Sequence, residues 1–217
     1  DPESLVGVPC IGGFDLSATE DFTSACLEFP LADGRVFVLS YSVIPAKKVE
    51  MDNEKLPYRE WEQEGWLSIC PGEYVEYKYI YNWFVEMSKK YSIQKICYDP
   101  ANAYRLVQDL KAYGGEEWTE VTRQGAMTLS PAFKDLKELM LDGKVIYNNN
   151  PLFRWYLNNV KLKPDTKGNW LPTKLNRYRK IDGFAAWLNA HTQTMKLMSQ
   201  PEAGGVEFIS IKDLLGR

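Results

Sequence analysis

Hydrophobic positions at the start of the chain follow the pattern of β-strands. Apolar runs over residues 10–16, 22–29 and 35–44 are separated by short polar segments, and the last of these segments contains Asp33-Gly34. An Asp-Gly pair between two apolar runs favours a tight hairpin. The pattern predicts three strands that form an antiparallel meander.

Strands and helices alternate in the middle of the chain. Apolar residues recur at helical spacing in three segments, with short apolar runs between them. The expected helices span 74–91, 101–113 and 131–141, and the expected strands span 94–98, 118–122 and 144–147. Such alternation favours parallel pairing with helices on the faces of the sheet. We therefore expect an α/β fold in which an antiparallel meander is continued by parallel strands.

The segment 45–72 is polar and is interrupted by Pro45, Pro57 and Pro71. We interpret it as an excursion over the surface with a helical turn at 58–61. After residue 150, the pattern predicts a helix over 151–158, a hairpin of 160–163 with 170–174, and a long helix over 181–198.

Length and composition fit one globular domain. The chain has 217 residues, of which 45% are hydrophobic and 25% are charged, as in soluble proteins with a sizeable core. No apolar run approaches the roughly 18 residues of a membrane span. We expect a domain over 10–198, preceded by a linker remnant over 1–9 and followed by a tail over 199–217. Since the chain starts at Asp1 without a Met, we expect a fragment or a processed product.

Four cysteines are scattered along the chain without a C-x-x-C pair: Cys10, Cys26, Cys70 and Cys97. Most of them lie in apolar runs, where a free thiol behaves as a small hydrophobic group. We expect reduced, structural cysteines in an intracellular protein. This spacing, together with the single histidine His191, disfavours a zinc site.

Charge is unevenly distributed. A net charge of −3 argues against a protein whose whole surface is positive and attracts nucleic acid. Between residues 161 and 180, however, Asp165 is the only acid, and the basic residues there are Lys161, Lys163, Lys167, Lys174, Arg177, Arg179 and Lys180. We predict that these side chains bind the phosphate backbone of DNA.

Three carboxylates stand at the ends of predicted elements. Asp15 and Asp99 end apolar strands, and Asp182 opens the last helix. A carboxylate beside a buried run is costly unless something compensates it, and hard divalent cations prefer oxygen ligands. Two such cations, bridged by shared carboxylates, activate water and relieve charge during phosphodiester cleavage. The three acids therefore predict a metal-dependent nuclease, with Asp15 as the bridging ligand.

Each acid also has a structural interpretation. Asp99 precedes Pro100 and could cap a helix, and the carboxylate of Asp182 suits a helix N-terminus. Asp15 is harder to explain in this way because Leu16 follows it. Asp21 fits a structural or supporting role better than a ligand.

The other candidates are weaker. Asp165 is a turn residue, and His191 is a packed or partly exposed histidine. Arg123 and Gln124 could touch phosphate or belong to a solvated loop. The chain has no G-x-x-x-x-G-K-[ST] phosphate loop, so we do not expect it to hydrolyse ATP by itself.

The acids belong to longer motifs with a definite order and spacing. These are Gly12-Gly13-Phe14-Asp15-Leu16-Ser17 with Asp21-Phe22-Thr23, then Tyr98-Asp99-Pro100, then Asn150-Pro151-Leu152-Phe153-Arg154-Trp155, and finally Lys180-Ile181-Asp182-Gly183-Phe184-Ala185-Ala186. Together they resemble the nuclease domain of large terminase subunits from tailed bacteriophages. The resemblance covers residues 10–195.

The resemblance implies a ribonuclease H-like fold with Mg²⁺ or Mn²⁺, two ions in all, at Asp15, Asp99 and Asp182. It implies an endonuclease, largely sequence-nonspecific, that cuts concatemeric phage DNA around packaging into a procapsid. In that family an ATPase domain precedes the nuclease domain, so Asp1 would lie just past the interdomain linker. Implied partners are double-stranded DNA, the portal protein and the small terminase subunit. The implied location is the cytoplasm of the infected host and, transiently, the procapsid portal.

Two alternatives stay open. The first is another ribonuclease H-like enzyme, such as a junction resolvase or a transposase core, which would prefer branched DNA or transfer strands. The second is a catalytically idle docking module for the portal or the small subunit, in which the acids serve as caps. Retained partner binding without metal binding would indicate the second.

Overall fold

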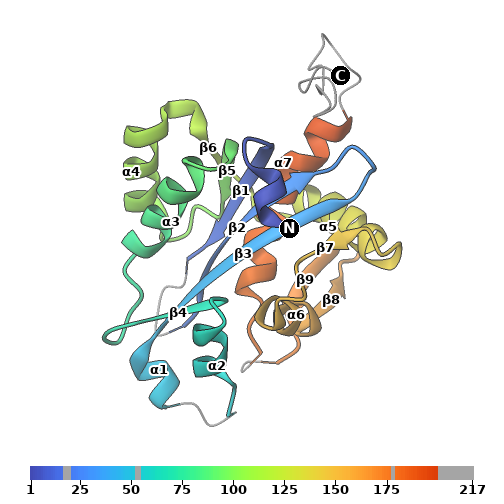
Figure 1. The fold of residues 1–217 in the computed structure, drawn as a ribbon. Helices are drawn as coiled ribbons and strands as arrows, with labels where there is room; N and C mark the ends of the chain where they lie inside the picture. Colours follow the sequence, from blue (N-terminus) through green and yellow to red (C-terminus); the bar gives the residue numbers. More distant parts are fainter. Residues whose placement is uncertain (17–20, 52–54, 177–178, 200–217) are drawn as a thin grey trace.

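A computed structural model describes residues 1–16, 21–51, 55–176 and 179–199 (Figure 1). Among these residues, a seven-stranded mixed sheet has the order β4-β3-β2-β1-β5-β6, with β7 paired to β3. The strands are β1 (Pro9–Asp15), β2 (Thr23–Pro30), β3 (Val36–Pro45), β4 (Leu67–Cys70), β5 (Ser92–Tyr98), β6 (Thr119–Val121) and β7 (Val145–Ile146). Strands β1 to β3 pair antiparallel, and the remaining pairings are parallel. The predicted α/β architecture is confirmed.

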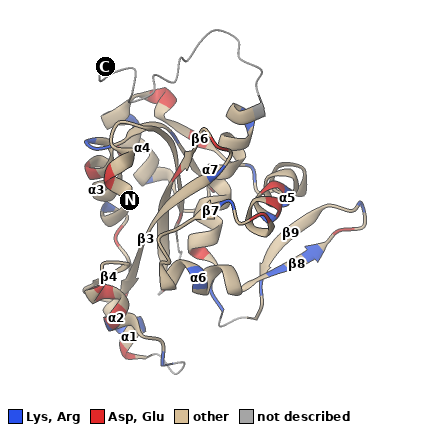
Figure 2. Cartoon of the chain, turned by 45° about the vertical axis from the view of Figure 1, so that its right-hand side comes forward, with Lys and Arg blue, Asp and Glu red and all other residues tan. Residues whose placement is uncertain are grey.

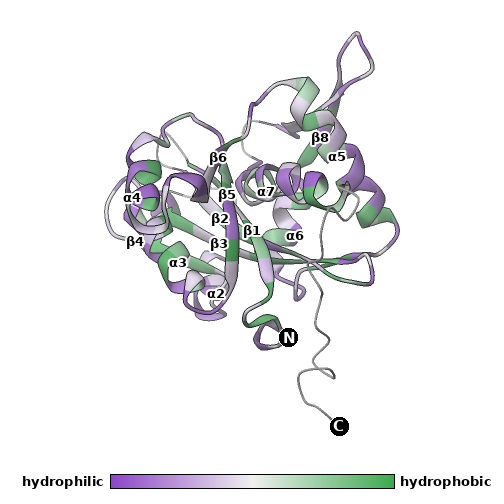
Figure 3. Cartoon of the chain, turned by 90° about the horizontal axis from the view of Figure 1, so that it is seen from above, coloured by the Kyte–Doolittle hydropathy of each residue, from purple (hydrophilic) through white to green (hydrophobic). Residues whose placement is uncertain are grey.

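Helices cover both faces of the sheet (Figure 3). On one face lie α3 (Lys78–Ser88) and α4 (Tyr104–Gly114), and on the other lie α5 (Ala126–Leu141), α6 (Pro151–Asn158) and α7 (Asp182–Ser199). The remaining elements are η1 (Pro2–Leu5), α1 (Ala46–Glu50), α2 (Tyr58–Gln63), η2 (Glu116–Trp118) and the hairpin of β8 (Val160–Pro164) with β9 (Trp170–Lys174).

The two faces of β1 belong to two hydrophobic cores, because successive side chains on a strand point to opposite faces. Ile11 packs in one core with Ala186 and Ala190 of α7. Phe14 packs in the other core with Phe84 of α3. The sheet is therefore buried on both sides along its central strands.

Adjacent glycines allow helices to approach both faces of β1. A Cβ atom at Gly12 would lie 2.9 Å from the Phe84 ring, and one at Gly13 would lie 2.1 Å from the carbonyl oxygen of Ala186. Any larger side chain at Gly13 would push α7 away from the sheet. This contact determines how closely the residues of α7 approach β1.

The interpretation of 45–72 as a surface excursion was only partly right. Helices α1 and α2 lie in it, and Tyr58 and Trp61 of α2 are buried. Strand β4 extends the sheet by parallel pairing with β3. A strand of four residues carries too short an alternation to be recognised between turn-forming prolines.

Three helix starts differ from those expected by more than one residue. Helix α3 begins at Lys78 rather than at residue 74. Helix α5 begins at Ala126, so Pro131 lies inside it rather than opening it. Helix α4 begins at Tyr104 with Ala103 as its N-cap. Asp99 is therefore not the cap of α4, and its Oδ1 instead accepts the Ala101 N–H in the turn that follows β5.

The remaining observations concern cysteines and membranes. All four cysteines are buried free thiols, as expected. Within the described ranges, none of the helices combines the length and apolar character that a bilayer crossing requires.

Leu5, in the expected linker remnant, is buried against the sheet.

Candidate metal centre

Sheet topology brings two of the predicted acids to one edge. Asp15 ends β1, and Asp99 directly follows β5, which pairs with β1 in parallel so that Phe14 lies opposite Tyr98. Side chains two residues apart share a face of a strand, and Gly13 faces α7. Asp15 therefore lies on the face that α7 covers.

Asp182 reaches the same edge as the first residue of α7. The Tyr156 ring packs on this first turn, because a Cβ atom at Gly183 would lie 2.4 Å from it. Asp182 is only 7% exposed. Its Oδ2 atom is buried and has no hydrogen-bond partner among the described residues. An orphaned carboxylate oxygen in the interior is costly and calls for a ligand.

Shifts in pKa show that the acids interact. Burial, followed by the charges of Asp182 and Asp99, raises the pKa of Asp15 to about 8. Burial, followed by the charge of Asp21, raises the pKa of Asp182 to about 6. Lys174 lowers both values without cancelling the rise. Burial and the neighbouring carboxylates therefore favour the protonated forms of Asp15 and Asp182 in the absence of an added cation.

Asp21 is closer to the centre than the sequence suggested. Its carboxylate forms an ion pair with Lys180, and each of the two side chains is 15% exposed. Because β1 and β2 form a hairpin, the chain returns at Asp21 to the edge where β1 ended. That expected hairpin was the available clue to its position.

Buried hydroxyl groups lie beside the acids and were not predicted. Ser24, opposite Asp15 in the β1–β2 ladder, lies 2.9 Å from Ser42 between their Oγ atoms. The Tyr156 hydroxyl donates to the Ser42 Oγ at 3.1 Å. Burial and the charge of Asp182 raise the pKa of Tyr156. These hydroxyls link the sheet to the helix that packs on Asp182.

The acids do not form a closed cage. Within the described part of the chain, no three His, Cys, Asp or Glu side chains converge enough to hold an ion as they stand. The Asp99 Oδ1 accepts the Ala101 N–H at 2.9 Å, and Asp21 is engaged with Lys180. The oxygen-only donor set and the orphaned Asp182 Oδ2 nonetheless fit a hard divalent cation.

Comparison with known proteins decides the family. The family model "Terminase large subunit, endonuclease domain" matches residues 1–197. The chain belongs to this family. It is 27% identical over 176 residues to the terminase large subunit of Enterobacteria phage HK97, covering 80% of this chain and 35% of that protein.

Solved structures agree with the fold. The HK97 large terminase has a TM-score of 0.79 at 25% identity, covering 87% of this chain and 40% of that chain. The nuclease domain of the phage SPP1 large terminase, solved with bound Mn, has a TM-score of 0.54 at 13% identity, covering 89% of this chain and 90% of that chain. The ribonuclease H-like fold is confirmed. The chain spans about a third of the length of its curated HK97 relative.

In this terminase nuclease domain, the described basic residues of 161–180 are spread over the β8–β9 hairpin and the segment that leads to α7 (Figure 2). Lys161 and Lys163 are exposed and share one face of the β8–β9 hairpin, whereas Lys174 pairs with Val160 and belongs to the opposite face. Lys167 is exposed in the connecting turn.

The remaining basic candidates lie between the hairpin and α7. Lys180 is held by Asp21, and Arg179 is half-buried. Arg177 lies outside the described residues.

The weaker candidates have structural contacts. Asp165 accepts the backbone N–H groups of Lys167 and Asn169, as expected for a turn residue. Gln124 donates to the Asn189 side chain at 3.1 Å. His191 is completely buried, so the packed alternative is right and the partly exposed one is wrong.

Proposed function

We propose that this chain is a metal-dependent DNA endonuclease in which Asp15, Asp99 and Asp182 hold Mg²⁺ or Mn²⁺. The supporting observation is that Asp15 and Asp99 end paired strands at one sheet edge, beside Asp182, whose Oδ2 is buried without a hydrogen-bond partner among the described residues. The SPP1 relative was solved with Mn. We extend this to two ions, with Asp15 as the ligand they share.

When bound, the ions would activate water and stabilise charge on the phosphate. The residues of the chain have distinct tasks in this proposal. Lys174, whose charge acts on both Asp15 and Asp182, orients a phosphate group at the carboxylates. Tyr156, packed on the first turn of α7, holds Asp182 in place and excludes water from its buried side.

Lys161, Lys163 and Lys167 would bind the DNA backbone along the outer face and turn of the β8–β9 hairpin. Phosphate contacts position a duplex but carry no base information. Cleavage is therefore proposed to be largely independent of sequence. Arg179 and Lys180 would act nearer the acids, with Lys180 shared between Asp21 and DNA.

In the whole protein, we propose that this domain follows an ATPase domain and cuts concatemeric viral DNA during packaging. The portal protein and the small terminase subunit would be its partners, in the host cytoplasm and at the procapsid. The match covers about a third of the HK97 large subunit, which leaves length in that relative for a further domain.

The test is conversion of supercoiled plasmid to nicked and linear forms with Mn²⁺, Mg²⁺ or EDTA. Wild type should cut only with metal, and Asp15→Asn should not cut. Asp33→Asn is the matched control, because Asp33 is an exposed carboxylate in the hairpin turn between β2 and β3. Equal activity of both variants would contradict the proposed site. Metal binding absent from wild type would favour the docking module.

A further inference from the structure

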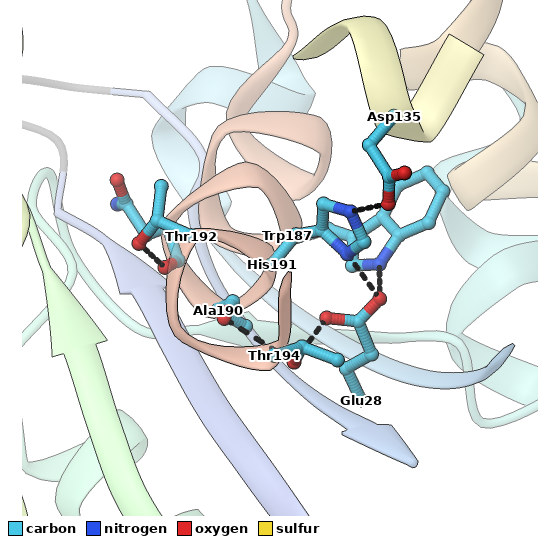
Figure 4. A network of polar contacts seen from close by, with 8 residues as sticks. Glu28, Asp135, Trp187, Ala190, His191, Thr192 and Thr194 are labelled. Atoms are coloured by element: carbon cyan, nitrogen blue, oxygen red, sulfur yellow. Dashed lines mark hydrogen bonds and ion pairs between the residues drawn. The ribbon is translucent and has the colours of Figure 1, made fainter. Parts of the chain in front are cut away.

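A charged cluster, buried except at Asp135, joins α7 to β2 and α5 (Figure 4). Glu28 on β2 is completely buried. It interacts with three side chains of α7: Trp187 Nε1 at 3.0 Å, His191 Nδ1 at 2.8 Å and Thr194 Oγ1 at 2.7 Å. On its other side, His191 Nε2 lies 2.8 Å from Asp135 of α5.

The cluster is ionic. Burial alone would lower the pKa of His191, but the charge of Glu28 and hydrogen bonds to Asp135 and Glu28 raise it to about 9. His191 is therefore an imidazolium between two carboxylates at neutral pH, and both ring nitrogens donate. Buried ion pairs contribute little net stability against an apolar core, but they demand a definite geometry. Such a cluster can fix how two elements are aligned.

The Asn189 side chain of α7 also donates a hydrogen bond to the Phe14 carbonyl oxygen of β1 at 2.9 Å, whereas the close contacts of α7 with Gly13 are less directional. Gly13 meets Ala186 and Ala190 at close range, and contacts among small residues allow close approach without marking a position along the helix. The three groups that meet Glu28 come from positions 187, 191 and 194, which lie on one face of a helix. A slide or rotation of α7 would break all three contacts together.

We infer that the Glu28–His191–Asp135 cluster is a positioning device that sets the register of α7 and thereby the placement of Asp182 against Asp15. This inference rests on the proposed metal centre. Nine residues of one helix separate Asp182 from His191, about 14 Å. Because a helix moves as a rigid rod over this distance, a shift at the cluster displaces Asp182 by a similar amount.

Two threonines of α7 provide a matched pair of variants. The Thr194 hydroxyl donates to Glu28, whereas the Thr192 hydroxyl donates at 2.8 Å to the Asn189 carbonyl of its own helix. Both side chains are buried. Replacing either with Val removes one hydroxyl at nearly constant volume, and only Thr194→Val weakens the cluster.

The experiment is calorimetric titration of Mn²⁺ into wild type, Thr194→Val, Thr192→Val and Glu28→Gln, with thermal unfolding of each protein in EDTA. We expect Thr194→Val to weaken Mn²⁺ binding by roughly fivefold and Glu28→Gln by more, which is the scale of coupling between distant sites. Thr192→Val should keep the wild-type affinity even where it lowers the melting temperature.

Three results would overturn the inference, and the last is distinguishable from the first two. Unchanged Mn²⁺ affinity in Thr194→Val and in every folded form of Glu28→Gln would show that the cluster only stabilises the fold. An equal loss of Mn²⁺ affinity in Thr194→Val and Thr192→Val would also show that the cluster has no special effect on the metal centre. Absence of Mn²⁺ binding in wild type would instead remove the metal centre itself, and the inference with it. Should Glu28→Gln fail to fold, Thr194→Val still decides, because Val preserves packing.

Discussion

Glu28, which packs against α7, and Asp182, the first residue of α7, are buried acids that are compensated differently. Glu28 is completely buried and has three donors, including a cation. Asp182 is nearly as buried, yet its Oδ2 has no partner among the described residues and its pKa rises to about 6. Groups of the chain itself satisfy the Glu28 carboxylate. The Asp182 carboxylate is not satisfied in this way, and in our proposal a metal ion completes it, so burial alone does not distinguish the two acids.

Removing the compensated acid should have the largest effect on stability. Glu28→Gln leaves the imidazolium of His191 without its main partner in the interior. We expect a loss of about 3 kcal/mol in the free energy of unfolding, the scale measured for breaking one side of a buried ion pair. Urea denaturation checks this, with Asp33→Asn as a surface control whose midpoint stays unchanged. A small loss for Glu28→Gln would mean that Glu28 is not the main partner.

Removing an acid of the proposed metal centre should destroy activity instead. Asp15→Asn takes one carboxylate from the proposed metal centre, and we expect metal-dependent plasmid cleavage to fall by at least roughly a hundredfold. Initial rates of nicking measure the effect. Glu120→Gln is the control, because Glu120 lies on β6 in surface ion pairs with Lys95 and Lys196. Equal rates for wild type and Asp15→Asn would remove Asp15 from the centre.

The same substitution should stabilise the metal-free protein. The pKa of Asp15 rises from an ordinary 3.8 to about 8 on folding, so the folded state holds its proton more tightly than the unfolded state. This reduces stability as pH rises, with no cost below pH 3.8 and the full cost above pH 8. In EDTA at pH 9, Asp15→Asn should therefore unfold at a higher urea concentration than wild type, and at pH 4 the difference should vanish. A constant difference across this range would contradict the raised pKa.

The cluster around His191 should respond to pH in a different window. Its pKa is raised from 6.5 to about 9, so its stabilising effect is full below pH 6.5 and is lost as pH rises through 9. Glu28 and Asp135 face it as charged groups, and the nearby thiols Cys26 and Cys97 stay neutral because burial raises their pKa values. The stability difference between wild type and His191→Gln should shrink from pH 6.5 to 9.5. Urea titrations at each pH measure it.

The smallest effects should come from the hairpin lysines. Lys161→Ala with Lys163→Ala removes two exposed cations from one face of β8. If both touch phosphate, the salt slope of duplex binding should fall by about 2, at close to 0.9 for each contact. Fluorescence anisotropy with two unrelated duplexes in EDTA measures this, and Lys89→Ala, at the residue that follows α3, is the control. An unchanged slope would place DNA elsewhere.

Much of this architecture was readable from local patterns. The three strands of the meander, the helix that carries Asp182 and the strand that ends before Asp99 were all expected, because alternation and helical spacing are properties of adjacent residues. Strand β4 and the true start of α5 were missed. Strand β4 is too short to show a pattern of its own, and it forms by pairing with β3, which is distant in the sequence.

The sequence by itself determined which acids end the elements, and parallel pairing of β1 with β5 then placed two of them together. Only the tertiary structure decided how each acid is compensated. Glu28 and His191 are 163 residues apart in the chain, and Asp21 and Lys180 are 159 apart. A local pattern says nothing about which distant side chain will meet a buried charge. Whether a carboxylate is satisfied or awaits a ligand is therefore decided by packing, because both burial and charge compensation are properties of the assembled fold.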